Sequence, residues 1–126
     1  MKIKRFKDIL AWQKARELNK MIYTITQKKS FSKDYTMIDQ IRRDSISIAS
    51  NIAEGFGRKT DKEFIQFLYI AKGSISEVQS QLYLSLDLGY IGKDEFKTVF
   101  DSSIECEKII NGFITYLKRT NNPTND

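Results

Sequence analysis

The chain has 126 residues but no histidine, only one cysteine and only one proline. Without histidine there is no imidazole for acid–base catalysis, for a Ser-His-Asp triad or for the Glu-x-x-His ligands of di-iron bundles. The single Cys106 excludes an internal disulfide and a cysteine-based zinc cluster. We therefore expect no enzyme activity, no cofactor and no metal, and we interpret Cys106 as a small buried apolar residue.

Long apolar runs are also missing. No stretch approaches the ~20 apolar residues that a membrane-spanning helix needs. Four of the first seven residues are basic, but Asp8, Gln13 and Lys14 interrupt the apolar run that a signal peptide would require. The composition, 40% hydrophobic and 12% aromatic, is typical of an ordered domain. We expect a cytoplasmic protein with no membrane partner.

Four segments repeat apolar residues at spacings of three and four, the period of an amphipathic helix. The predicted helices cover about residues 8–28, 36–54, 60–89 and 93–119, and the only proline, Pro123, lies beyond them. Their predicted core stripes include Leu18, Ile22, Ile48, Ile52, Leu68, Ile75, Cys106 and Ile110. The pattern predicts an all-α protein, an antiparallel up-and-down four-helix bundle over residues 1–119, followed by a disordered tail at 120–126.

Helix ends are predicted from capping residues. Asp8 is the expected N-cap of the first helix. Thr60 and Glu63 form the pattern of a capping box at the start of the third helix. Gly55 and Gly57 are expected to end the second helix by adopting positive φ.

The outer faces of the two middle helices carry few long charged residues. On the third helix, the face opposite the core contains Gly73, which costs about 1 kcal/mol relative to alanine inside a helix. Small residues at spacings of three and four allow another helix to approach closely, so we interpret this face as a contact between copies; the alternative is a weakly stable helix that faces solvent. The residues predicted to form the interface are Arg43, Ser47, Asn51, Glu54, Arg58, Tyr69, Gly73, Ser76 and Ser80.

Charge is unevenly distributed along the chain, whose net charge is +5. Residues 1–30 contain nine lysine and arginine residues against two acids, whereas residues 61–126 contain seven against ten. A basic N-terminal third indicates contact with RNA or DNA, pairing with acidic faces of other helices, or simply a solvated face. The candidate nucleic-acid contacts are Lys2, Lys4, Arg5, Lys7, Lys14, Arg16 and Lys20.

One motif in the second helix is distinctive. Gln40-Ile41-Arg42-Arg43 is followed by Ser-Ile-Ala-Ser-Asn-Ile-Ala-Glu-Gly-Phe-Gly-Arg at 47–58. This run resembles the bacterial four-helix-bundle family first noticed as open reading frames in 23S rRNA intervening sequences, sometimes called S23 proteins. Weaker matches at 10–15 and 64–77 extend the resemblance over residues 6 to about 117.

The resemblance implies a homopentamer, and it brings in a relative, the accessory protein of diversity-generating retroelements, a pentameric barrel that engages reverse transcriptase and nucleic acid. Two functions stay open: a self-assembling bundle that binds nucleic acid, and a scaffold that recruits an enzyme such as a reverse transcriptase. The family's polar signature falls on Arg42, Arg43, Asn51, Glu54 and Arg58. The chain departs from the family at Asp44, whose negative charge beside the two arginines argues against phosphate binding there.

Overall fold

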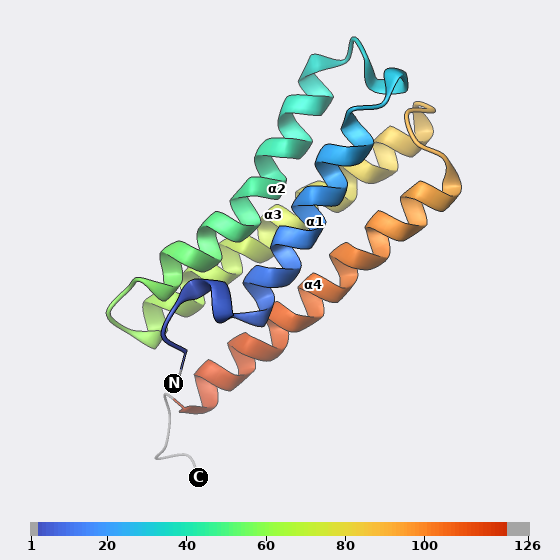
Figure 1. Ribbon diagram of the computed structural model, residues 1–126. Coiled ribbons are helices and arrows are strands. Elements are labelled where there is room, and N and C mark those ends of the chain that lie inside the picture. The colour runs from blue at the N-terminus through green and yellow to red at the C-terminus, as the bar shows by residue number, and fades with distance from the viewer. Residues whose placement is uncertain (1–2, 121–126) are drawn as a thin grey trace.

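The structure is a computed structural model that describes residues 3–120, and over this range it forms a bundle of long helices (Figure 1). Its elements are η1 (Phe6–Asp8), α1 (Leu10–Thr26), η2 (Lys29–Phe31), α2 (Tyr35–Phe56), α3 (Asp61–Asp87) and α4 (Lys93–Thr120). Each α-helix packs against the next, and α1 also packs against α4. The predicted all-α, up-and-down four-helix bundle is therefore confirmed.

The two ends of the bundle are built from different segments. The α1–α2 and α3–α4 connections lie at one end, whereas η1, the α2–α3 connection and the end of α4 lie at the other (Figure 1). Of the tail predicted at 120–126, Thr120 is the last residue of α4 and the rest lies outside the described residues.

The core follows the predicted stripes. Its completely buried side chains include Leu18, Ile22, Ile48, Ile52, Leu68, Ile75, Cys106 and Ile110. Burial raises the pKa of the Cys106 thiol to about 12, so that this cysteine is an apolar core residue as predicted. Three buried residues that periodicity missed, Ile9, Phe31 and Ile91, lie outside the α-helices and cover the ends of the core.

Several helix ends differ from those predicted. Asp8 belongs to η1, and Ile9, which has no capping side chain, precedes α1. Gly55 lies inside α2, and Gly57 follows it with a φ of −77°, so neither glycine ends the helix through positive φ. Thr60 does cap α3, since its hydroxyl accepts a hydrogen bond from the Glu63 backbone N–H at 3.1 Å. Position 55 favours glycine because a larger side chain would collide with α3, and not because the helix ends there.

Candidate functional site

Small and apolar residues make up most of the outer face of α3, which also carries the exposed Gln66 and Glu77. We define the α3 outer face as the exposed residues Tyr69, Ile70, Gly73, Ser76, Ser80, Tyr83 and Leu84. Its four large side chains are between 46% and 52% exposed. A Cβ atom added at Gly73 would meet nothing within 4 Å, so no packing inside the subunit requires glycine there. The chain therefore exposes a strip of α3 that is apolar on the side away from its own core.

The outward side of α4 is different. It carries the exposed charged residues Lys97, Asp101, Lys108 and Arg119, which is typical of a helix that faces water. The contrast between two adjacent helices of one bundle singles out the α3 outer face as the candidate contact surface.

Two aromatic residues of the α3 outer face are held in place by α4. The Tyr69 hydroxyl accepts a hydrogen bond from Lys118 Nζ at 2.8 Å, and this bond lowers the pKa of Tyr69. The Tyr83 ring lies 4.9 Å from the Phe96 ring and 5.2 Å from the Phe100 ring, measured between centroids. Because their positions are fixed before any partner arrives, little side-chain entropy would be lost on binding.

A line of polar side chains runs between α2 and α3. We define the α2–α3 polar seam as Gln40, Asp44, Ser47, Asn51, Ser74, Glu77 and Gln81. Ser74 Oγ donates to Ser47 Oγ at 2.9 Å, and Asn51 Nδ2 donates to the same hydroxyl at 2.9 Å. The structure thus places the predicted interface residues Ser47 and Asn51 half-buried beside α3, at the edge of the outer face rather than on it.

Asp44 is the most deeply buried charged residue of the seam, with 7% of its surface exposed. Its Oδ2 atom accepts hydrogen bonds from Gln40 Nε2 at 3.1 Å and Gln81 Nε2 at 2.7 Å. The Glu77 carboxyl lies against it, and charge repulsion from Asp44, with burial and a hydrogen bond between the two groups, raises the pKa of Glu77.

The structure separates Asp44 from Arg42, one of the two arginines whose phosphate binding its charge was expected to oppose. Successive residues of a helix point about 100° apart. Asp44 turns toward α3, whereas the Arg42 guanidinium lies 4.4 Å from the centroid of the Tyr23 ring on α1 and its Nε donates to Thr26 Oγ1 at 2.8 Å.

The signature arginines differ in how they are held. Arg58 pairs with Glu54 at 2.9 Å, and its guanidinium lies 4.7 Å from the centroid of the Phe67 ring. Arg43 is exposed, and within residues 3–120 no ion pair or side-chain hydrogen bond holds it. Unlike Arg42 and Arg58, Arg43 is therefore available to a partner.

The cations predicted to bind nucleic acid do not form one patch. Lys14 pairs with Glu17 at 3.1 Å and with Glu105 at 2.9 Å. Arg16 lies 5.6 Å from the centroid of the Trp12 ring, on the α2 side of α1. The remaining cation of α1, Lys20, borders a groove on the α4 side together with Asp94 and Glu95, and Lys2 lies outside the described residues.

Other cations do converge at one end of the bundle. We define the basic end as the exposed residues Lys4, Arg5, Lys7, Arg58, Lys59, Lys62, Lys118 and Arg119. They come from η1 and its flank, the α2–α3 connection, the first turn of α3 and the last turn of α4, which lie together in Figure 1. The charge distribution along the sequence did not predict five of these residues as nucleic-acid contacts: Arg58, Lys59, Lys62, Lys118 and Arg119. They join the others only because the helices bring distant segments to the same end.

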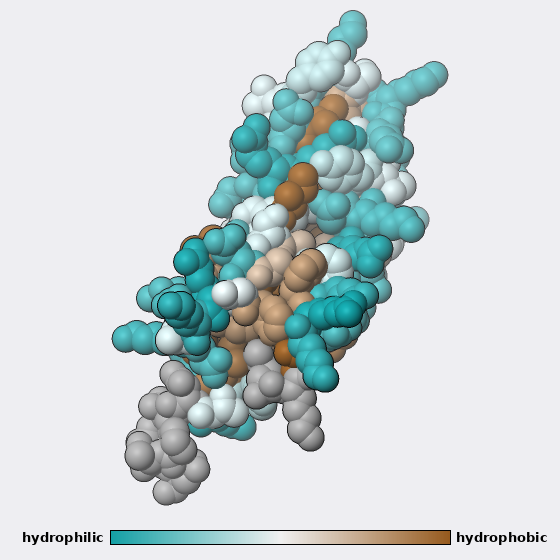
Figure 2. All heavy atoms as spheres, turned by 60° about the vertical axis from the view of Figure 1, so that its left-hand side comes forward, coloured by the Kyte–Doolittle hydropathy of each residue, from teal (hydrophilic) through white to brown (hydrophobic). Residues whose placement is uncertain are grey.

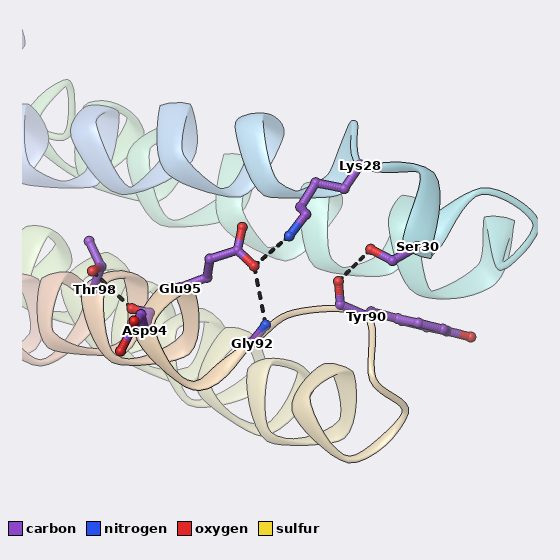
Figure 3. A network of polar contacts seen from close by, with 7 residues as sticks. All are labelled: Lys28, Ser30, Tyr90, Gly92, Asp94, Glu95 and Thr98. Atoms are coloured by element: carbon purple, nitrogen blue, oxygen red, sulfur yellow. Dashed lines mark hydrogen bonds and ion pairs between the residues drawn. The ribbon is translucent and has the colours of Figure 1, made fainter.

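The opposite end is tied together by neutralising contacts, shown in Figure 3. Lys28 pairs with Glu95, whose carboxylate also accepts a hydrogen bond from the Gly92 backbone N–H at 3.1 Å. Ser30 Oγ donates to the Tyr90 carbonyl at 2.6 Å. These bonds join the α1–α2 connection to the α3–α4 connection and to the first turn of α4. The two ends of the bundle therefore differ in both charge and bracing.

Two negative findings apply to residues 3–120. No cluster of three histidine, cysteine, aspartate or glutamate residues there could hold a metal ion. None of the helices in that range has the length and apolar character needed to cross a membrane.

These features define an up-and-down four-helix bundle with a small, apolar outer face on α3 and a basic end. The model of the 23S rRNA-intervening sequence protein family matches residues 7–112, and the chain belongs to this family. It is also similar to the crystal structure of a protein of unknown function from the S23 ribosomal protein family of Bacteroides thetaiotaomicron VPI-5482. The two chains are 26% identical, with a TM-score of 0.76, over 83% of this chain and 98% of that one. No curated protein matches the chain.

Proposed function

We propose that this protein is a non-catalytic bundle that assembles with copies of itself through the α3 outer face. The observation that carries the proposal is the strip of half-exposed Tyr69, Ile70, Tyr83 and Leu84 around an unfilled Gly73. Burying apolar surface at an interface stabilises the assembly by about 25 cal/mol per Å². Close packing of a second helix against Gly73 would thereby offset the helix-weakening effect of the glycine.

The face that includes α2 supports the same proposal. Figure 2, turned to bring the α2 side forward, shows brown and pale side chains in an interrupted band between hydrophilic margins. Ile46 on α2 is 46% exposed. A contact that used different faces of α2 and α3 on neighbouring copies would be heterologous, and it would form a ring when the rotation between neighbours closes. The family resemblance implies a ring of five copies.

The solution mass tests this proposal directly. One subunit has a mass of 14.7 kDa, and a closed ring of five would have a mass of about 74 kDa. We expect light scattering coupled to size exclusion to give a multiple of the subunit mass at micromolar concentration. A single subunit under these conditions would overturn the proposal.

RNA or DNA is the second candidate partner, and the basic end favours it. Eight exposed lysine and arginine side chains from four segments gather there. Because lysine and arginine side chains define this end, binding would rest on phosphate contacts with little sequence preference. In the alternative role, a scaffold, the assembly would instead recruit a nucleic-acid enzyme such as a reverse transcriptase.

Salt dependence separates these roles. We expect a labelled single-stranded RNA to bind at least about tenfold more weakly at 200 mM than at 50 mM salt, because phosphate contacts release counterions. Lys59→Glu with Lys62→Glu, at the basic end, should weaken binding further. Lys33→Glu with Lys93→Glu, near the opposite end, is the charge-matched control. Tight binding that ignores salt, or equal loss in both double variants, would contradict phosphate-led binding at the basic end.

A further inference from the structure

The α2–α3 polar seam contains more acceptors than donors. The Asp44 and Glu77 carboxyls lie against each other, and the groups that donate to Asp44 Oδ2 are the neutral amides of Gln40 and Gln81. The other amide atom of Gln81, Oε1, is buried and has no hydrogen-bond partner within residues 3–120. A buried acceptor without a donor costs about 1–3 kcal/mol, so the seam lacks a group rich in N–H donors.

The pair is accessible from outside the subunit. Asp44 is buried, but Glu77 is exposed at the border of the α3 outer face. Among residues 3–120 no lysine or arginine forms an ion pair with either carboxyl. The carboxyl pair is therefore free to accept a cation from another molecule.

Arg43 has the complementary property. It is exposed on α2 and has no ion-pair partner among residues 3–120, whereas Arg42 and Arg58 are held by contacts within the subunit. It precedes Asp44 in the chain but points about 100° away around the helix, toward the outside of the bundle. Within residues 3–120, each subunit thus presents a guanidinium without an ion pair and, on the next side of α2 and the adjoining side of α3, a carboxyl pair without a cation.

We propose that Arg43 of one copy inserts its guanidinium into the α2–α3 polar seam of a neighbouring copy and binds the Asp44–Glu77 carboxyl pair. This inference rests on the self-assembly proposed above. A guanidinium supplies five N–H donors in a rigid fork, enough for both carboxyls and Gln81 Oε1. The seam borders the α3 outer face, so the apolar contact and the ion pair would belong to one interface.

The pair would set which residues meet rather than supply most of the affinity. Charged groups at an interface fix register and exclude wrong partners, while the surrounding apolar surface contributes most of the binding free energy. The pair would also make the contact heterologous, because the donor Arg43 and the acceptor seam lie on different sides of each subunit.

A charge exchange tests the pairing. Arg43→Glu and Glu77→Arg each place like charges in contact, and we expect each to weaken assembly at least about tenfold. The double variant Arg43→Glu with Glu77→Arg restores opposite charges between positions 43 and 77, while Asp44 stays unchanged, and should recover assembly at least in part. Both positions are exposed, so the substitutions leave the core intact. Lys108→Glu, on the outward side of α4, is the charge-reversal control and should assemble like the wild type.

The outcomes distinguish this inference from the proposal beneath it. A wild-type protein that stays a single subunit contradicts both the proposed self-assembly and the Arg43 pairing. A wild type that assembles, together with an Arg43→Glu variant of unchanged mass and dissociation constant, overturns the pairing alone. The pairing is equally overturned when both single variants dissociate and the double variant, helical by circular dichroism, stays dissociated.

Discussion

Gly73→Leu is expected to leave a folded helical bundle that no longer assembles. In the isolated subunit the new side chain points into open space, since a Cβ atom at this position has no neighbour within 4 Å. Leucine also favours the helix by close to 1 kcal/mol relative to glycine, so the subunit itself should be no less stable. At a close contact between helices, the same side chain would hold the two backbones apart and expose the apolar strip to water.

Light scattering and thermal unfolding measure the two halves of this expectation. Gly112→Leu is the matched control, because Gly112 is also exposed inside a long helix with nothing within 4 Å of an added Cβ. It should assemble like the wild type. A Gly73→Leu variant with the wild-type mass would show that the α3 outer face is not the contact surface.

Gly55→Ala is expected to lower the free energy of unfolding by about 1–3 kcal/mol, the usual cost of overpacking. An added Cβ would lie 2.7 Å from Phe67 Cβ and 2.8 Å from Phe64 Cδ1. Phe67 Cβ is fixed to the α3 backbone and cannot swing aside, so the two helices must separate. The helix preference for alanine offsets only part of this cost.

Gly57→Ala provides the control two residues further on. Its added Cβ would lie 3.5 Å from the Glu54 carbonyl oxygen, an ordinary contact, and its φ of −77° suits any residue. We expect it to be neutral or slightly stabilising, by up to about 1 kcal/mol, because alanine restricts the unfolded chain. Urea unfolding followed by circular dichroism measures both variants. Equal midpoints would show that α2 and α3 are not closely packed at Gly55.

The core of each helix was predictable because burial repeats with the helical period. The stripes through Leu18, Ile48, Ile75 and Ile110 are buried as expected. Phe31 and Ile91 were not predictable in this way, because each lies in a connection where no period exists. The two glycines after Glu54 looked alike in the sequence, and only the position of the α3 phenylalanines separates their roles.

The candidate site was predicted in part. Tyr69, Gly73, Ser76 and Ser80 are exposed on the outer side of α3 as the helical period indicates. In the sequence, Asp44 groups with the adjacent Arg42 and Arg43. Its spacing from the buried Ile41 and Ile48, however, already places it toward the inside of α2. Its partners Gln40 and Gln81 come from two helices, and pairing across helices cannot be derived from one segment.

The long axis of the bundle has a defined direction, because one end is basic and the other is braced and neutralised. In a ring with a single rotation axis, and with the bundles running along that axis, every bundle points the same way, so all the basic ends would gather on one side and their fields would add. A further two-fold axis would send half of them to the opposite side. Cyclic and dihedral arrangements of this chain would therefore offer a polyanion one strong platform or two weaker ones.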